Sequence, residues 1–314
     1  MIGRVVFLTI VCGLILLTGC YVSQPPRPQE SCDPKLAPLL RAMEAVKPLH
    51  TKMGKPKLYD WLAEHPEEKG QTFAEYLKAN PVLPTEQRKT IYVQPLGEFT
   101  EQERRIVHLT SEYLTLFFNL PVKQNEALPL SLAPNKARRA SPLEKGVEQI
   151  QSSFVRDQIL KPRLPGDAAA MIAFTSADLY PGAGWNYVFG EASLIDRVGV
   201  WSIHRFGNPD SIYGDFQLVL LRTLKLATHE TGHMFSIPHC TKYECNMSGT
   251  NHIGETDSRG LDVCPECMAK ICWGMKYDPL QRYEKLAEFC RVNQLGKEQK
   301  YFAAAARAIK QSYS

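Results

Sequence analysis

Three histidines, His229, His233 and His239, restrict the fold and chemistry of this chain more than any other feature. The first two belong to the pattern H-E-x-x-H, and residues four apart on a helix share one face, so both imidazoles can reach one cation. Pro238 ends the helix and lets the chain turn back towards the same cation. Three imidazoles leave one place in a tetrahedral zinc shell for water. The pattern predicts a catalytic zinc site in which Glu230 acts as general base.

Four cysteines follow at the spacing of a second metal site: Cys240, Cys245, Cys264 and Cys267. Four thiolates close a zinc shell, so this ion would hold the loop together without taking part in the chemistry. In an oxidising compartment the same residues could form two disulfides, and C-x-x-C could be a redox pair. We favour zinc, because both pairs lie beside the first site and no thioredoxin-like βαβ pattern precedes the C-x-x-C.

The chain begins like an exported lipoprotein. A run of apolar residues too short to span a bilayer comfortably ends in Leu17-Thr18-Gly19-Cys20, which is similar to a bacterial lipobox. An ordinary secretory signal or a short anchor helix is the alternative. We expect Cys20 to carry lipid and the protein to be exported and anchored to a bacterial membrane, at the outer membrane, its periplasmic face or the cell surface.

Strands and helices alternate in the middle of the chain, which predicts an α/β or α+β class with a mixed sheet. Strands are expected at 90–96, 121–130, 170–176, 188–195 and 198–206. Helices are expected after Thr100, over 142–160, over 213–235, and as a hairpin over 279–294 and 298–312.

The sequence predicts that the chain is divided into five segments. They are a signal peptide (1–19), a Pro-rich tether (20–30), a helical N-terminal extension (31–88), a catalytic domain (89–277) and a C-terminal helical hairpin (278–314). The net charge of +4 is spread without a dense Lys/Arg stripe, so nothing supports nucleic-acid binding. We expect a monomer.

Residues 90 to 275 resemble the archaemetzincins, whose pattern is H-E-x-x-H-x-x-G-x-x-H-C followed by C-x-M and C-x-x-C. The run from His229 to Cys240, then Cys245-Asn246-Met247, then the pair Cys264 and Cys267 carry the resemblance. It continues upstream through the segments 178–181 and 188–194. The resemblance implies a metzincin-like fold: a mixed, mostly parallel sheet, an active-site helix and a zinc-stapled loop. It also implies two zinc ions per chain, one catalytic and one structural, with Met247 as the methionine turn beneath the catalytic ion.

The chain departs from this family pattern at one important place. Ser236 stands where the family has glycine, which makes a tight turn at little steric cost. Serine can occupy such a turn with some strain. Some metzincins carry a tyrosine two residues after the methionine, but that position is Gly249, so no second oxyanion stabiliser is identified. We expect His252 to be an exposed loop residue and His204 to be a packed or surface residue.

The expected activity is zinc-dependent hydrolysis of a peptide or protein substrate, which would pair with an edge strand within Val188 to Phe206. One alternative is a catalytically weak or inactive, zinc-stabilised, peptide-binding lipoprotein. Another is a thiol oxidoreductase that uses Cys264 and Cys267. The sequence leaves open the substrate, the cleavage mode, and the states of Cys32, Cys272 and Cys290.

Overall fold

The computed structural model describes residues 34–212 and 215–313. The expected signal peptide, the tether, Cys20 and Cys32 lie outside the described residues. Across the described part of the chain, no helix is both long and apolar enough to cross a membrane.

A five-stranded mixed sheet forms the centre of the molecule, in the order β2-β1-β5-β8-β7. All neighbours are parallel except β7 and β8, which are antiparallel. The strands are β1 (Thr90–Leu96), β2 (Val122–Gln124), β5 (Ala168–Thr175), β7 (Gly190–Ala192) and β8 (Val198–Ser202). The strand expected over 121–130 is therefore confined to β2, and β7 and β8 are also shorter than expected. β7 forms an open edge of the sheet.

Both faces of this sheet are buried, which explains why β5 is apolar throughout. Ile172 and Phe174 pack into the core on the side of the helices, whereas the alternate residues Met171 and Ala173 pack into a second core on the other face. A continuous apolar run is the usual pattern of a strand covered on both sides. The class is a mixed α/β fold, as expected.

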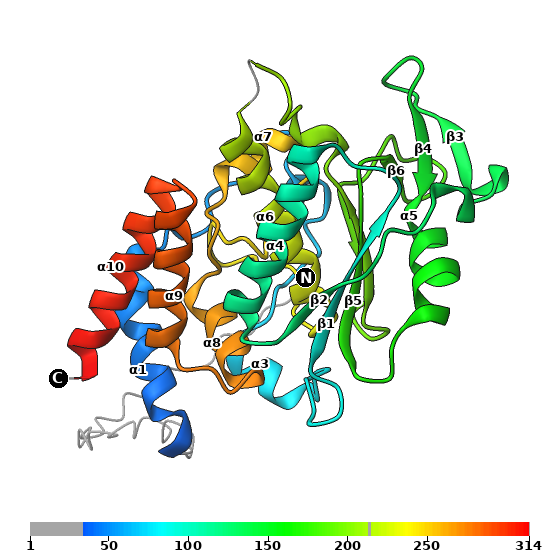
Figure 1. Ribbon diagram of the computed structural model, residues 1–314. Coiled ribbons are helices and arrows are strands. Elements are labelled where there is room, and N and C mark those ends of the chain that lie inside the picture. The colour runs from blue at the N-terminus through cyan, green and yellow to red at the C-terminus, as the bar shows by residue number, and fades with distance from the viewer. Residues whose placement is uncertain (1–33, 213–214, 314) are drawn as a thin grey trace, which may run out of the picture.

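Two long helices cover the first face (Figure 1). Thr100 begins α4 (Glu101–Phe118) with a capping box that includes Glu103. The Asp215 side chain caps α6 (Phe216–Met234) by accepting a hydrogen bond from the Leu218 amide at 2.9 Å. Both helices occur where the apolar periodicity predicts them, and α6 carries the H-E-x-x-H residues.

The helix expected over 142–160 is wrong in its first half. A three-stranded sheet of β3 (Arg138–Ala140), β4 (Glu148–Gln151) and β6 (Asp178–Tyr180) lies here instead. The chain turns at Gly146, whose φ is +83°. β4 then pairs in parallel with β6, the strand that follows β5 in the sequence. Only the short turns α5 (Ser152–Phe154), η5 (Val155–Leu160) and η6 (Lys161–Arg163) are helical. Pairing with a distant strand overrides the local apolar pattern.

Helices from both ends of the chain pack at one side of the molecule. Figure 1 shows α1 (Ala37–Val46) beside the hairpin of α9 (Pro279–Val292) and α10 (Gly296–Tyr313). The hairpin agrees with expectation. α8 (Pro265–Gly274), which follows the third cysteine and was not expected, packs against α1. Buried apolar residues from all four helices belong to the same core as those of α4 and α6.

The N-terminal extension is only partly helical. Beyond α1 it contains η1 (Pro34–Leu36), η2 (Lys47–Leu49), α2 (Trp61–Glu64) and α3 (Phe73–Lys78). Long stretches without regular structure run between η2 and α3, across the surface that carries the histidines and cysteines. The remaining short elements are η3 (Leu130–Leu132), η4 (Asn135–Ala137), η7 (His204–Phe206) and α7 (Ile253–Ser258).

Candidate metal centre

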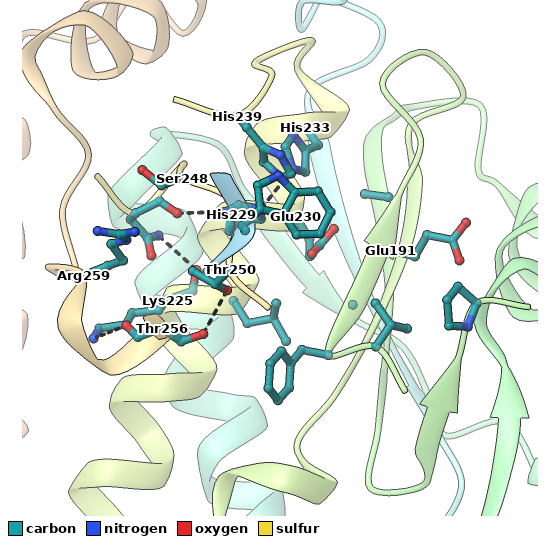
Figure 2. Close-up of a pocket in the computed structure, with 18 of the residues that line it drawn as sticks. Glu191, Lys225, His229, Glu230, His233, His239, Ser248, Thr250, Thr256 and Arg259 are labelled. Carbon is teal, nitrogen blue, oxygen red and sulfur yellow. Dashed lines mark hydrogen bonds between the residues drawn. The ribbon is translucent and has the colours of Figure 1, made fainter. Parts of the chain in front are cut away.

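The three histidines converge. His229 and His233 lie one turn apart on α6, with 3.0 Å between their Nε2 atoms, and the ring centroid of His239 lies 5.3 and 5.0 Å from theirs. One nitrogen of each ring lies within 4.8 Å of the others. Figure 2 shows His233 and His239 above Glu230 and His229 beside it. The sequence spacing thus corresponds to a real cluster of imidazole nitrogens.

Ser236 produces the turn that brings His239 back. Its φ is +60°, in the left-handed region, and its amide donates to the His233 carbonyl at 2.8 Å. The Ile237 amide donates to the Gly232 carbonyl at 3.1 Å. These two bonds form the Schellman motif that ends many helices at a glycine. The Ser236 hydroxyl also donates to the Leu194 carbonyl at 3.1 Å and accepts from the Val82 amide at 3.0 Å.

Each imidazole uses its Nδ1 atom in a hydrogen bond. His229 donates to the Asn246 carbonyl and His233 to the Ile237 carbonyl, both at 2.7 Å. His239 donates to the Glu68 carboxylate, at 2.9 Å to Oε1 and 3.1 Å to Oε2. Such bonds set the tautomer that leaves Nε2 free for a metal.

Burial keeps the first two imidazoles neutral, and the neutral ring is the form that binds a cation. Burial, and next the charge of His239, lowers the pKa of His229 to about 3. Burial also holds the pKa of His233 well below its usual value, with His229 and His239 adding to the effect. The donor set and its protonation state therefore fit zinc.

Glu230 lies between the histidines and the open edge of the sheet. Its side chain packs against Gly190 of β7, where a Cβ atom would lie 2.9 Å from Glu230 Oε1. Burial, and next the charge of the nearby Glu191 carboxylate, raises the pKa of Glu230 to about 8. Glu191 itself pairs with Arg156 and accepts from the Ser152 hydroxyl. A peptide on β7 would thus lie next to Glu230.

Met247 lies directly beneath the helix turn that carries the first two histidines. It is fully buried, and a Cβ atom on Gly232 would lie 2.6 Å from its Sδ atom. The Cys240 amide donates to the Met247 carbonyl at 2.7 Å. The position fits a methionine turn.

The four cysteines form a second cluster. Their sulfur atoms lie within 4.8 Å of one another, and the Sγ atoms of Cys240 and Cys264 are 3.6 Å apart. Zinc–sulfur bonds of about 2.3 Å in a tetrahedron place the sulfurs roughly 3.8 Å apart, whereas a disulfide needs about 2.05 Å. The Cys245 sulfur also accepts from the amides of Cys264 at 3.1 Å and Met247 at 3.4 Å. The cluster fits a zinc ion better than two disulfides.

The two further cysteines that the structure describes are also unpaired. Cys272 and Cys290 are buried and free, so they form no disulfide with each other. The Cys272 thiol faces the Met268 sulfur at 3.6 Å. Burial raises the pKa of Cys272 to about 12, which makes it an inert core residue rather than a nucleophile.

A third group of possible ligand atoms consists of Asp60, His252 and Glu255. Glu255 already accepts from two main-chain amides and from Arg259. His252 accepts from the Glu255 amide at 3.1 Å and so caps α7, and its other nitrogen lies 3.4 Å from Asp60. These groups satisfy one another, which favours a structural role. His204 pairs with Glu144 at the surface at 3.2 Å.

A cavity of about 370 Å³ opens beside the histidines. Its apolar wall consists of Trp61, Trp185, Val188, Phe189, Phe206 and Leu226. Figure 2 shows Lys225, Thr250, Thr256 and Arg259 together on one side of the histidines and Glu191 on the other. Two neighbours of the site, Glu68 and Trp61, were not expected. They lie about 170 residues before His239, and no spacing in the sequence connects them to it.

Comparisons with known proteins identify relatives of this chain. The sequence profile described as peptidase family M54 matches residues 136–272. Human archaemetzincin-2 is 31% identical over 281 aligned residues, which cover 78% of this chain and 77% of that protein. Mouse archaemetzincin-1 is 28% identical and covers 74% and 52%.

Among solved structures, archaemetzincin from Archaeoglobus fulgidus, complexed with malonate, is 27% identical. It covers 58% of this chain and 99% of its own, with a TM-score of 0.45. The archaemetzincin from Methanopyrus kandleri is 24% identical and covers 62% and 98%, with a TM-score of 0.48. The family profile matches, and the human relative is similar over most of both chains. This chain therefore belongs to the archaemetzincins, the zinc metallopeptidases of family M54.

Proposed function

We propose that this chain hydrolyses peptide bonds with one zinc ion held by His229, His233 and His239, and with Glu230 as general base. The observation that carries the proposal is the position of Glu230, between three converging imidazoles and the open sheet edge. When bound, zinc would supply a Lewis acid that polarises the scissile carbonyl and acidifies the attacking water. Glu230 would take the proton from that water and pass it to the leaving amine.

Substrate binding follows from the pairing of β7. The Phe189 carbonyl and the Ser193 N–H form hydrogen bonds with the neighbouring strand β8. Because successive residues of a strand point their main-chain groups to opposite sides, the N–H and C=O groups of Gly190 and Ala192 face the open edge. An extended peptide can add there as a further strand. The apolar cavity beside Glu230 would receive a substrate side chain. These features support a peptidase with a metzincin-like cleft.

A second, structural zinc is part of the proposal, with Cys240, Cys245, Cys264 and Cys267 as its ligands and Met247 as the methionine turn. The support is the 3.6 Å sulfur separation and the main-chain N–H groups aimed at Cys245. We also propose export and a lipid anchor on Cys20, which the lipobox-like sequence alone supports.

The test is Glu230→Gln, which keeps the shape of the side chain and removes its basicity. Removing a general base costs about 10² to 10⁴ in rate, so the variant should lose cleavage of a peptide library while elemental analysis still finds two zinc ions per chain. His239→Ala should lose one of the two ions and serves as the control for metal content.

The alternative is a peptide-binding lipoprotein without turnover, which the same edge strand and cavity would serve. If wild type and Glu230→Gln leave the library equally uncut while both retain two zinc ions and bind peptides, the binding protein is the correct interpretation. Insulin reduction that survives a chelator and is lost in Cys264→Ser would instead favour a thiol oxidoreductase.

A further inference from the structure

A segment from the N-terminal extension, residues 59–71, lies across the third histidine, and we call it the clasp. It lies outside the residues that match the M54 profile. At its start, the Trp61 amide donates to the Glu255 carboxylate at 3.1 Å. The Asn251 amide group donates to the Tyr59 carbonyl at 3.3 Å and to Glu64 at 3.0 Å. Residues beyond the methionine turn therefore hold this end.

The other end of the clasp is held by the cysteine loop and α8. The Thr241 hydroxyl donates to the Lys69 carbonyl at 3.1 Å, and the buried Lys270 ammonium donates to the Gln71 carbonyl at 2.8 Å. The approach is close at Gly70, where a Cβ atom would lie 2.6 Å from the Thr241 Oγ1 atom. The clasp is thus fixed on both sides of His239.

Glu68 lies between these two anchors and contacts His239. Both of its carboxylate oxygens lie within 3.1 Å of the imidazole Nδ1 atom, and the two side chains are only 26% and 19% exposed. His229 and His233 donate to main-chain carbonyls near the helix. His239 lies on a loop, and its Nδ1 partner is a side chain from far away in the sequence.

Trp61 is the second clasp residue that contacts His239. Its ring meets His239 edge-on, with centroids 5.0 Å apart and an interplanar angle of 80°, and it stacks on His65 at 4.0 Å. The indole also lines the cavity. A Cβ atom on Gly249 would lie 2.3 Å from Trp61 Cδ1, so this glycine leaves the space that the indole fills. His239 is therefore held from two directions by the clasp.

We propose that Glu68 is a positioning residue that orients His239 for the metal, and that Trp61 restrains the same ring. The inference rests on the proposed zinc site. A carboxylate that accepts from the far nitrogen of a ligating histidine fixes the direction of the ring and makes it a better donor. The catalytic site of this chain would thus be complete only with the clasp in place.

The test measures zinc affinity by competition with a chromogenic chelator, independently of peptide cleavage. Glu68→Ala should weaken the catalytic-site zinc about 10- to 100-fold, the usual effect of losing such a partner. Glu68→Gln keeps an oxygen at the same place and should recover most of the affinity. The control is Glu44→Ala, which removes the same charge from an exposed side chain outside the clasp, whose ion-pair partner is Lys47 at 3.0 Å. It should leave the zinc affinity unchanged.

A double-mutant cycle separates positioning from general support of the fold. His239→Ala does not keep the catalytic-site ion through purification, so its remaining two-histidine site is titrated with added zinc. In that background, Glu68→Ala should have no further effect on zinc affinity, because its target is absent. An equal loss in both backgrounds, or unchanged affinity in Glu68→Ala, overturns this inference and leaves the proposed function standing. A wild-type chain whose three histidines bind no zinc overturns both.

Discussion

At position 236, a serine adopts a backbone conformation that usually belongs to glycine. A left-handed residue with a Cβ atom costs about 1–2 kcal/mol. Ser236 has a φ of +60°, and its hydroxyl bonds to Val82 in the N-terminal extension and to Leu194 beyond the edge strand. Each such bond contributes about 1 kcal/mol. Serine thus gains from its hydroxyl roughly what it loses in the backbone.

Two substitutions separate the cost of the left-handed backbone from the contribution of the hydroxyl hydrogen bonds. Ser236→Ala keeps the backbone strain and loses both hydrogen bonds, so the free energy of unfolding should fall by about 1–3 kcal/mol. Ser236→Gly loses the same bonds but relieves the strain, so its stability should stay within about 1 kcal/mol of wild type. Urea unfolding measures both. Equal destabilisation of the two variants would show that the left-handed turn is not strained here.

At the scale of elements, α9 is connected to the catalytic helix through hydrogen bonds. Fully buried Arg282 donates to the Asp262 carboxylate at 2.9 Å. Burial would lower the pKa of its guanidinium, but Asp262 raises it above the usual value, so the guanidinium stays charged. The Asp262 carbonyl then accepts from the Asn246 amide at 3.2 Å, and the Asn246 carbonyl accepts from His229. The C-terminal hairpin therefore supports the metal site.

Arg282→Ala should destabilise the protein by about 3–5 kcal/mol, because it leaves the buried Asp262 side chain without its guanidinium partner. The matched control is Arg291→Ala on the same helix, which breaks an exposed pair with Glu288 and should cost less than about 1 kcal/mol. Thermal or urea unfolding distinguishes the two. A small effect of Arg282→Ala would mean that water replaces the guanidinium and that the connection to the site is weak.

Elements with a strong local signal were predictable from the sequence. The cap at Thr100 and the apolar period predicted α4, and the same reasoning predicted α6 and the hairpin, because each buries one continuous stripe. The structure of segment 142–160 was not predictable, since β4 depends on pairing with β6, 29 residues later. Non-local pairing leaves no periodic signal in the strand itself.

At the scale of the whole molecule, the candidate site was predictable only where its residues are close in sequence. The histidines and cysteines have ligand spacings that report their geometry. Glu68 and Trp61 have no such spacing, because the clasp reaches the site only after the extension has wrapped around the cysteine loop. For the same reason, the extension looked like a separate helical part when its packing was unknown.

The two proposed zinc sites share one stretch of chain, so we expect each site to depend on the other to a different degree. Cys240 directly follows His239, and its amide bonds to the Met247 carbonyl. A structural zinc contributes about 10–16 kcal/mol in small domains, comparable with the stability of a whole protein. Without it the loop should lose the arrangement that directs His239 and Met247 towards α6.

We therefore expect Cys264→Ala to lose both zinc ions and to lower the melting temperature strongly, whereas His229→Ala loses one ion with a small thermal change. Elemental analysis and scanning calorimetry measure the two effects. The asymmetry arises because His229 lies on α6, whose side-chain cap and buried stripe hold it, while His239 depends on the loop that the cysteines hold. Cys264→Ala with one zinc ion bound at wild-type affinity would show that the histidine site forms independently of the cysteine cluster.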